Sequence, residues 1–469
     1  MNYKAYFKGK KITVLGLGLL GRGINITKFL AECGAELLVT DLKTKEQLAT
    51  ALRSLKNLTI YRKVKFVLGR HRLSDFRNCD MVIKAAGVPL DSPYIAEAKK
   101  NKIPVEMDAS LFAKLVRGVT IIGVTGTRGK STVTRLIYEI LKTNLGLNRF
   151  HKETIGQKTL HSKVFLAGNV RGMATLPLIK KVKAGDVVVM ELDSWQLQGF
   201  SDSRISPHIS VFTNFMRDHQ NYYKGNMKKY FSDKANIYKY QKKGDYLVMG
   251  TSIAKYIEYQ PKAGRPLAEK IIARGNDIPK TWKIKLLGEH NKENIACAIR
   301  VAEVLGIRAG VIRKAVEDFS GVPGRLEFVR TWNGISFYND TTATTPDATM
   351  AALNALHSTT IIYDSGGVIL IAGGSDKNLD YKNFVKEVTK KTKALILFSG
   401  TATEKIKKLL PKDFLYTEVR NMKEALKQAL ARSGKGDTVL LSPGAASFGI
   451  FKNEYDRGDQ FVRAVKSLK

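Results

Sequence analysis

A glycine-rich segment that ends in a lysine and two hydroxyl residues, Gly123–Thr132, is the strongest chemical signal in this chain of 469 residues. An apolar run, Val119–Ile122, precedes it, and an amphipathic stretch, Val133–Leu141, follows it. A strand, a glycine-rich turn and a helix in this order aim backbone N–H groups and a helix N-terminus at a phosphate. Lys130 would reach the outer phosphates, and the hydroxyl of Ser131 would bind Mg²⁺. The segment therefore predicts a site for ATP and Mg²⁺.

A second glycine-rich turn lies near the N-terminus. Gly16, Gly18 and Gly21 follow the strand-like run Lys11–Leu15, and Asp41 stands at the end of the next such run. In the dinucleotide fingerprint, a helix N-terminus holds a diphosphate and the acidic residue holds a ribose hydroxyl. NAD and a UDP-sugar both offer these groups. The turn predicts a diphosphate site and leaves the ligand open.

The chain is strongly basic. Its 78 Lys and Arg residues exceed its 42 Asp and Glu residues, which gives a formal net charge of +36. Such a charge can serve nucleic-acid binding, but the lysines are spread along the whole length and form no basic tail. We expect an anionic substrate and no specific nucleic-acid partner.

Cysteine usage and hydropathy indicate the compartment. Cys33, Cys79 and Cys297 lie far apart and fit neither a zinc spacing nor a disulfide framework. The chain has no apolar run long enough for a membrane span and no apolar signal core at its start. We expect a cytoplasmic protein with reduced thiols and no membrane association.

Strand and helix patterns alternate along the chain, which predicts an α/β fold with mostly parallel sheets. At roughly 150 residues per domain, the length indicates three domains. Breaks near Arg117–Gly118 and Gly321–Gly324 place these domains at residues 1–118, 119–322 and 323–469. The last domain has the pattern of a doubly wound α/β domain.

Individual elements follow from the same patterns. A hairpin joins Leu326–Arg330 to Ile335–Asn339, helices cover Met227–Tyr240 and Asn291–Leu305, and residues 254–285 form short strands and loops. The predicted strands of the parallel sheets are Lys11–Leu15, Leu37–Asp41, Asp80–Lys84, Val119–Ile122, Asp186–Glu191, His208–Phe212, Asp245–Met249, Val368–Ala372, Ala394–Phe398 and Thr438–Leu441.

Polar residues follow several of these strands. Glu191, Asn214 and the pair Asp218-His219 come after strands of the middle domain, and Asn339-Asp340 ends the hairpin. Ligands in such folds bind outside the carboxyl ends of the strands. We therefore expect Glu191 beside the phosphate loop.

Taken together and in this order, the motifs resemble those of the Mur ligases over essentially the full chain. The motifs that carry the resemblance are Gly16–Gly21, Thr125–Thr132, Glu191–Leu197, Asp218-His219, His290–Asn294, Gly324–Glu327, Asn339-Asp340 and Leu441–Pro443. The resemblance implies a Rossmann-like UDP-binding domain, a central P-loop ATPase-like domain and a C-terminal domain that binds an amino acid.

The resemblance also implies the reaction. Such ligases use ATP to activate a carboxylate as an acyl phosphate, which the amino group of an incoming amino acid then attacks. For this chain it implies addition of D-glutamate to UDP-N-acetylmuramoyl-L-alanine in peptidoglycan precursor synthesis, by a monomer whose domains close for catalysis. The alternative is the same chemistry with another amino acid, such as L-glutamate. An NAD-dependent oxidoreductase or a nucleic-acid-dependent ATPase would each leave most of the motifs unexplained.

The roles of individual residues are likewise implied by the resemblance. The catalytic residues would be Lys130, Glu191, His219 and Lys234, and the Mg²⁺ ligands would be Ser131, Glu191, His219 and Lys234 as its carbamate. The ATP site would comprise Gly126, Thr127, Arg128, Gly129, Lys130, Ser131, Thr132, Asn294, Arg325 and Asp340. The UDP-substrate would contact Gly16, Gly18, Gly21, Asp41, Asn169 and Ser194, and the amino acid would contact Thr344, Lys377 and Ser447.

Four positions depart from the usual pattern of this family. Thr342 stands where many members have a lysine, and Glu454 replaces an aromatic or similar residue. Asp193 stands where a serine is usual, and Asn221 replaces an aspartate. The first two changes lie near the expected amino-acid pocket, so the choice of amino acid stays open at this point.

Overall fold

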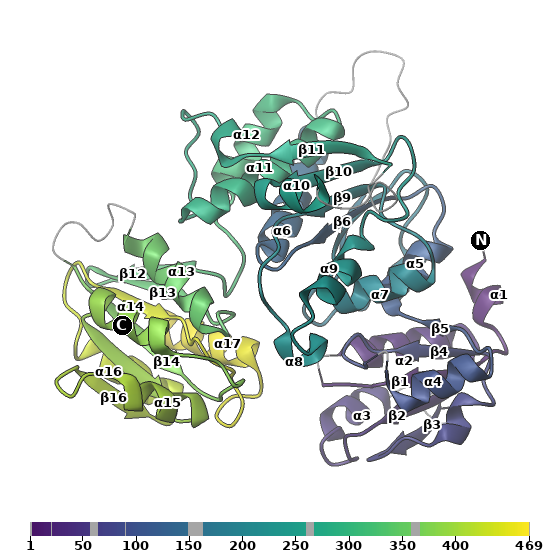
Figure 1. Cartoon of the computed structure of the whole chain (residues 1–469), viewed down its shortest axis with the longest axis horizontal. Coiled ribbons are helices and arrows are strands. Elements are labelled where there is room, and N and C mark those ends of the chain that lie inside the picture. The colour runs from purple at the N-terminus through teal and green to yellow at the C-terminus, as the bar shows by residue number, and fades with distance from the viewer. Residues whose placement is uncertain are drawn as a thin grey trace. The chain divides into compact units, whose positions relative to one another are not determined.

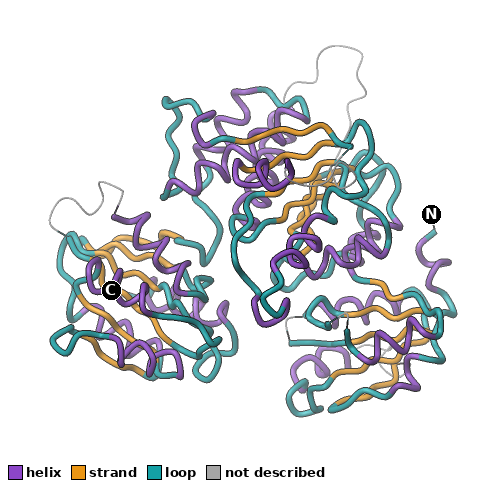
Figure 2. The backbone as a smooth tube through the Cα atoms, in the orientation of Figure 1, coloured by secondary structure: helices purple, strands orange, loops and turns teal. Residues whose placement is uncertain are grey.

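The computed structural model describes residues 2–19, 21–56, 64–89, 91–148, 163–258, 267–357 and 366–468. These residues form two compact units. The first unit comprises Met1–Ile278 and Glu293–Ala315, and the second comprises Pro279–Lys292 and Val316–Lys469. Each unit is built from β-sheets with helices packed on them (Figures 1 and 2). The predicted α/β fold is thus confirmed.

The N-terminal sheet of the first unit is fully parallel and has the strand order β3-β2-β1-β4-β5. Its strands are β1 (Lys11–Leu15), β2 (Glu36–Asp41), β3 (Val64–Leu68), β4 (Met81–Lys84) and β5 (Val105–Glu106). Its helices are α1 (Tyr3–Phe7), α2 (Arg22–Glu32), α3 (Ala49–Lys56), the 3₁₀ turn η2 (Leu73–Phe76), α4 (Pro93–Lys100) and α5 (Asp108–Leu115). Both faces are covered, because Val14 and Leu15 of β1 belong to different apolar clusters.

The second sheet of this unit is also parallel, in the order β11-β10-β9-β6-β8-β7. Its strands are β6 (Thr120–Thr125), β7 (Val164–Gly168), β8 (Val187–Glu191), β9 (Ile209–Phe212), β10 (Tyr246–Gly250) and β11 (Glu269–Ala273). The helical elements are α6 (Lys130–Asn148), η3 (Leu176–Lys180), α7 (Ser194–Asp202), α8 (Gln220–Tyr223), α9 (Met227–Ala235), α10 (Thr251–Glu258), η5 (Gly275–Asp277), α11 (Glu289–Val304) and α12 (Ala309–Asp318).

The sheet of the second unit has the order β12-β13-β17-β14-β15-β16, with only the β12–β13 pair antiparallel among its described pairings. Its strands are β12 (Glu327–Trp332), β13 (Ile335–Asn339), β14 (Val368–Gly373), β15 (Ala394–Phe398), β16 (Tyr416–Val419) and β17 (Thr438–Leu441). Helices α13 (Pro346–His357), α14 (Lys382–Lys391) and α15 (Thr401–Leu409) pack on one face, and α16 (Met422–Leu430) and α17 (Glu454–Lys466) pack on the other.

Apolar runs explain why the predicted strands formed. Every residue of β9, β14, β15 and β17 is buried, as expected for parallel strands covered by helices on both faces. The prediction missed β3, β7 and β16, whose sequences are short and whose side chains are only partly buried. The two predicted domain boundaries stay predictions.

Two predicted elements differ from the structure. The helix expected over Met227–Tyr240 ends at Ala235, and the next five residues form turns. Ser206 and Ser210 donate hydrogen bonds to the carbonyls of Asn236 and Ile237, so tertiary contacts replace the helical bonds there. The prediction of short strands and loops within 254–285 was also partly wrong, because α10 runs to Glu258. Residues 259–266 of that range lie outside the described residues.

One apolar cluster extends through both sheets of the first unit. Helix α5 and the 3₁₀ turn η3 contribute to it through Leu111, Phe112 and Leu176. The carboxylate of Asp108, the first residue of α5, accepts hydrogen bonds from the backbone N–H groups of Thr175 and Leu176 at 2.8 and 2.7 Å. This buried carboxylate therefore fixes η3 against α5.

Replacing Asp108 tests this contact. In Asp108→Ala, two buried N–H donors lose their acceptor, so we expect the free energy of unfolding of the first unit to fall by about 2–4 kcal/mol. Denaturant unfolding followed by tryptophan fluorescence measures the loss. The exposed Asp91 gives the matched control, since Asp91→Ala should change stability by no more than about 0.5 kcal/mol. Equal effects of the two substitutions would contradict this account.

Candidate active site

The phosphate loop joins the end of β6 to the start of α6 and is packed too tightly for side chains at two positions. A Cβ atom at Gly126 would collide with the hydroxyl of Thr213, and one at Gly129 would collide with the side-chain amide of Asn294. Both glycines also have positive φ angles, which glycine adopts at little cost. The structure thus places Asn294 of α11 directly against the loop, and its contact with adenine stays a prediction.

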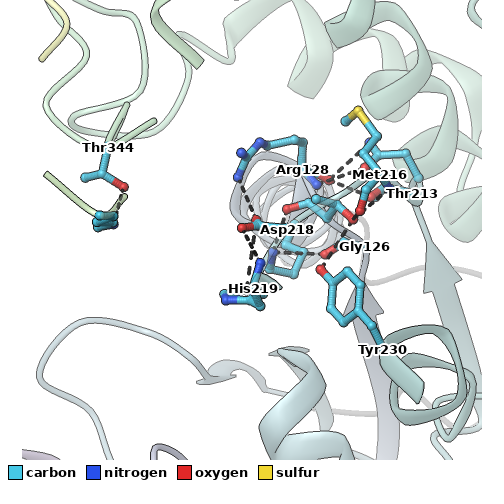
Figure 3. A network of polar contacts seen from close by, with 12 residues as sticks. Gly126, Arg128, Thr213, Met216, Asp218, His219, Tyr230 and Thr344 are labelled. Atoms are coloured by element: carbon cyan, nitrogen blue, oxygen red, sulfur yellow. Dashed lines mark hydrogen bonds and ion pairs between the residues drawn. The ribbon is translucent and has the colours of Figure 1, made fainter. Parts of the chain in front are cut away.

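The segment after β9 shapes this loop through hydrogen bonds (Figure 3). Asn214 accepts hydrogen bonds from the N–H groups of Thr127 at 3.0 Å and Arg128 at 2.8 Å, through its carbonyl and its side chain respectively. The hydroxyl of Thr213 donates to the carbonyl of Arg128 at 2.6 Å. Met216 N–H donates to the Thr127 hydroxyl at 3.0 Å. The loop is therefore held in shape by protein contacts alone. Sequence reasoning missed Thr213.

Two oxygen donors meet where α6 begins and β8 ends. The hydroxyl of Ser131 donates to Glu191 Oε2 at 2.5 Å, and Asn169 Nδ2 donates to Glu191 Oε1 at 3.4 Å. Mg²⁺ is bound in proteins by one or two carboxylates together with substrate phosphates. A hydroxyl and a carboxylate beside a phosphate loop match that donor set, so the residues fit the ion. Glu191 lies beside the loop, as the sequence predicted.

Two lysines converge on one carbonyl of the loop. Lys130 Nζ and Lys234 Nζ donate to the carbonyl oxygen of Gly126 at 3.0 and 2.8 Å. Lys234, on α9, is almost fully buried. Burial and the neighbouring charge of Lys130 lower the pKa of Lys234 well below its ordinary value. The environment therefore favours the neutral amine, which is the nucleophilic form that reacts with CO₂; the carbamate itself stays a prediction.

Asp218 and His219 follow β9, and the Asp218 carboxylate contacts both Arg128 and the N–H of His219 (Figure 3). Arg128 Nη1 donates to Asp218 Oδ2 at 3.1 Å. Burial would raise the pKa of the Asp218 carboxyl, but the neighbouring His219 and the charge of Arg128 hold it below its ordinary value. Burial lowers the pKa of His219. Its imidazole is therefore neutral at physiological pH and able to bind a metal.

An aromatic group orients His219. The His219 ring lies 4.9 Å from Trp195 and 5.8 Å from Tyr230, centroid to centroid. Lys234 Nζ lies 5.0 Å from the centroid of the same Tyr230 ring, so His219 and Lys234 share one neighbour. Sequence reasoning missed Trp195 and Tyr230 because their spacing resembled ordinary core residues.

The N-terminal glycine-rich turn is held by the acidic residue of its motif. Gly16, Gly18 and Gly21 all have positive φ angles. Asp41 accepts hydrogen bonds from Gly18 N–H at 3.0 Å and from Lys43 N–H at 2.9 Å, each through a different carboxylate oxygen. The carboxylate of Asp41 thus shapes the turn itself.

Helix α7 explains one departure from the family pattern. The side chain of Asp193 caps α7 by accepting from Gln196 N–H at 2.7 Å, and Asp193 N–H donates in turn to the side-chain oxygen of Gln196. This capping box stabilises the helix start. Ser194, a predicted substrate contact, is the buried first residue of that helix. Asn221 is another residue that departs from the family pattern, and its side chain is not among those that the structure describes.

In the second unit, the predicted amino-acid contacts lie on loops that touch one another. Lys377 Nζ donates to the Thr344 hydroxyl at 3.2 Å. The loop that carries Lys377 pairs with the loop that carries Ser447, since Ser375 and Ala446 exchange backbone hydrogen bonds of 2.9 and 3.0 Å. The structure therefore brings Thr344, Lys377 and Ser447 to one loop cluster.

Asp340 and Thr342 hold the turn that carries Arg325. Asp340 accepts hydrogen bonds from Leu326 N–H at 3.0 Å and from the Ser442 hydroxyl at 2.8 Å. The hydroxyl and the N–H of Thr342 both donate to the carbonyl of Gly324, at 2.9 and 3.1 Å. Thr342, at the position where the family resemblance led us to expect a lysine, therefore clamps this turn.

A fully buried arginine, Arg457, supports the same loops, a role that the sequence did not predict for it. Its guanidinium donates to the carbonyls of Thr341 at 2.8 Å and Ala445 at 3.4 Å. Burial lowers the pKa of Arg457 to about 10. The clue in the sequence was an arginine at the buried face of an amphipathic helix, next to Gly458.

Matches to known protein families span most of the chain. Residues 10–106 match the MurD-like N-terminal domain of Mur ligases, residues 124–269 match the Mur ligase middle domain, and residues 324–444 match the Mur ligase glutamate ligase domain.

Whole-length relatives agree. A UDP-N-acetylmuramoylalanine–D-glutamate ligase of Roseiflexus sp. (strain RS-1) is 33% identical over 98% of this chain and 99% of its own. One of Borreliella afzelii (strain PKo) is 34% identical over 98% of each chain. The chain belongs to the Mur ligase family. This family consists of ATP-dependent ligases, so the predicted family and enzyme class are confirmed.

Solved structures share the fold at low sequence identity. The UDP-N-acetylmuramate–alanine ligase MurC of Thermotoga maritima is 18% identical, has a TM-score of 0.57 and covers 98% of this chain and 100% of its own. The MurF ligase of the same organism, in complex with ADP, is 16% identical with a TM-score of 0.58, covering 99% and 96%. These likenesses extend across all three sheets.

The Asp340 carboxyl predicts a pH dependence of stability. Burial raises its pKa from 3.8 to about 7. Because the folded state then holds a proton that the unfolded state releases, stability is highest below the unfolded pKa and falls by up to about 4 kcal/mol as the pH rises towards the folded value. Asp340→Asn cannot ionise and should lack this decline.

Denaturant unfolding of the wild type and of Asp340→Asn at about pH 5 and about pH 8 measures the difference. We expect the loss of stability between these values to be larger in the wild type by about 2–3 kcal/mol. The same pH slope in both proteins would contradict the raised pKa.

Proposed function

We propose that this chain is an ATP-dependent ligase that joins D-glutamate to UDP-N-acetylmuramoyl-L-alanine, in the synthesis of peptidoglycan precursors. The observation that carries the ATP chemistry is the convergence of Lys130, Ser131, Glu191 and Asn294 on one glycine-rich loop. The substrate pair is supported by the names of whole-length relatives that are 33% and 34% identical.

In the first step, a carboxylate oxygen of the alanyl group attacks the γ-phosphorus of ATP. The bond from the γ-phosphorus to the bridging oxygen breaks, ADP leaves, and an acyl phosphate forms. Lys130 and the backbone N–H groups of residues 126–132 supply positive charge to the phosphoryl oxygens during this transfer. Asn294 holds the adenine, and Arg325 and Asp340 complete the ATP site.

In the second step, the amino group of glutamate attacks the acyl carbon. Loss of a proton from the amine and departure of phosphate leave an amide. Lys377, Thr344 and Ser447 hold the carboxylates of the incoming amino acid and so place its amine, which is the main catalytic contribution in a reaction between two bound partners. The contact between Lys377 and Thr344 supports this assignment.

The metal sites follow from the donor set. Ser131 and Glu191 would hold one Mg²⁺, and His219 with carbamylated Lys234 would hold a second. When bound, Mg²⁺ neutralises charge on the transferring phosphoryl group. The neutral state of His219 and the lowered pKa of Lys234 support these roles.

The UDP-substrate would bind at the N-terminal domain. Gly16, Gly18 and Gly21 would receive its diphosphate, Asp41 would orient the turn, and Asn169 and Ser194 would contact its muramoyl end. We further propose that the protein acts as a cytoplasmic monomer without a specific nucleic-acid partner. Within the described ranges, the structure contains no helix that is long and apolar enough to cross a membrane.

Phosphate release tests the substrate assignment. The protein is supplied with ATP, Mg²⁺ and UDP-N-acetylmuramoyl-L-alanine, and D-glutamate is compared with L-glutamate and a panel of other amino acids. We expect release that depends on D-glutamate. Release with another amino acid instead would keep the fold and the mechanism and place the specificity at Thr342 and Glu454. No release with any amino acid would reject the muramoyl substrate.

The carbamate of Lys234 has its own test. Removal of CO₂ and bicarbonate at about pH 6 should lower the activity, because carbamates revert to amines in acid, and added bicarbonate should restore it. Lys234→Gln should lose about 100-fold or more in kcat and should not respond to bicarbonate. Lys228→Gln, an exposed lysine on the same helix, should keep both the activity and the response. A wild type indifferent to bicarbonate would count against the carbamate.

A further inference from the structure

Arg22, the first residue of α2, lies directly after the last glycine of the N-terminal turn. Its guanidinium reaches the loop after β7 through three hydrogen bonds. Nε donates to the carbonyl of Met173 at 3.2 Å, and Nη2 donates to the carbonyl of Gly168 at 3.1 Å and to Asn169 Oδ1 at 3.2 Å. A planar fork with several donors is suited to hold such a set of acceptors.

The loop that Arg22 holds lies on the backbone of Glu191. Asn169 N–H donates to the carbonyl of Glu191 at 2.7 Å. A Cβ atom at Gly168 would collide with that same carbonyl, and Gly168 has a positive φ angle. The position of the Gly168-Asn169 segment therefore determines the surroundings of Glu191.

The bond to Arg22 also decides which way the Asn169 amide faces. Because Arg22 can only donate, it must take the oxygen of this amide. The NH₂ group is then left for Glu191 Oε1, at 3.4 Å, while Glu191 Oε2 accepts from the Ser131 hydroxyl at 2.5 Å. If the amide turned over, two acceptor oxygens would face each other and the carboxylate would lose its support.

We propose that Arg22 is a positioning residue for the Ser131–Glu191 pair, acting through Asn169. The inference rests on the proposed function only in taking Ser131 and Glu191 as Mg²⁺ ligands. A continuous chain of hydrogen bonds runs from Arg22, which directly follows the N-terminal glycine turn, through Asn169 and Glu191 to Ser131 at the end of the phosphate loop. It links the diphosphate site of one domain to the phosphate site of the next.

The test is the Mg²⁺ dependence of ADP binding, measured by calorimetry without the muramoyl substrate or an amino acid. Outer contacts of metal ligands are typically worth 10- to 100-fold in affinity; for this more remote residue we expect Arg22→Gln to raise the Mg²⁺ concentration at half-saturation by about 3–10-fold. Arg22→Lys keeps the charge but not the fork, so it should show the same loss. Binding of ADP without Mg²⁺ should be unchanged in both.

A matched control lies one helical turn further on. Asn25 Nδ2 donates to the carbonyl of Gly172 at 3.1 Å, so Asn25→Ala removes a hydrogen bond between the same helix and the same loop without touching Gly168 or Asn169. It should leave the Mg²⁺ dependence unchanged. An equal shift in Asn25→Ala would show general loosening between these elements and overturn the proposal, as would wild-type Mg²⁺ dependence in Arg22→Gln.

A double-mutant cycle keeps the inference testable if one variant folds poorly. Asn169→Ala should weaken Mg²⁺-dependent binding by a similar factor, and adding Arg22→Gln should cause little further loss, because both act along one path. Fully additive losses would overturn the proposal. If ADP binding to the wild type does not depend on Mg²⁺, the proposed metal ligands are wrong and this inference is wrong with them. If ADP binding depends on Mg²⁺ but the enzyme uses another amino acid than D-glutamate, the proposed substrate is wrong and this inference still holds.

Discussion

Two lysine side chains, Lys130 and Lys234, donate to a single carbonyl oxygen, that of Gly126, and much of the site depends on this contact. Placing two like charges side by side in a buried region is unfavourable unless one is neutral or an anion lies between them. The loop keeps this unfavourable arrangement because hydrogen bonds with Thr213 and Asn214 hold its backbone. The site is therefore prepared for negative charge, either as a phosphate near Lys130 or as a carbamate on Lys234.

The fold could be predicted well because its parallel strands are continuous apolar runs that point to no other structure. Where burial is partial, as in β3 and β16, apolar and polar residues alternate too weakly to separate a strand from a loop. The end of α9 shows another limit of local patterns. Its helical signal continues, yet hydrogen bonds from distant serines capture the next carbonyls, and such partners cannot be inferred from sequence spacing.

The candidate site likewise contains some residues whose positions could be predicted from sequence patterns and others whose positions could not. Residues inside continuous motifs, such as Ser131 and Glu191, could be placed beside each other because strand order implied it. Arg22, Arg457 and Thr342 could not, because each acts on a carbonyl far away in the chain. When a side chain binds the backbone of a distant segment, neither the side chain nor that segment needs a particular sequence pattern, so the contact cannot be predicted. Thr342 shows the consequence: a change that seemed to remove a charge from a pocket in fact adds a clamp on the Arg325 turn.

The apolar cluster that runs through both sheets of the first unit has a consequence for how the protein opens. Domains with separate cores unfold one by one, but a shared core makes opening of either sheet expose apolar surface of the other. The sheet with the nucleotide-sugar turn and the sheet with the phosphate loop should therefore melt as one cooperative block. The second unit, whose described apolar clusters lie on the faces of its own sheet, is free to unfold independently of the first, and its unfolding would remove the turn that carries Arg325 while the phosphate loop stays folded.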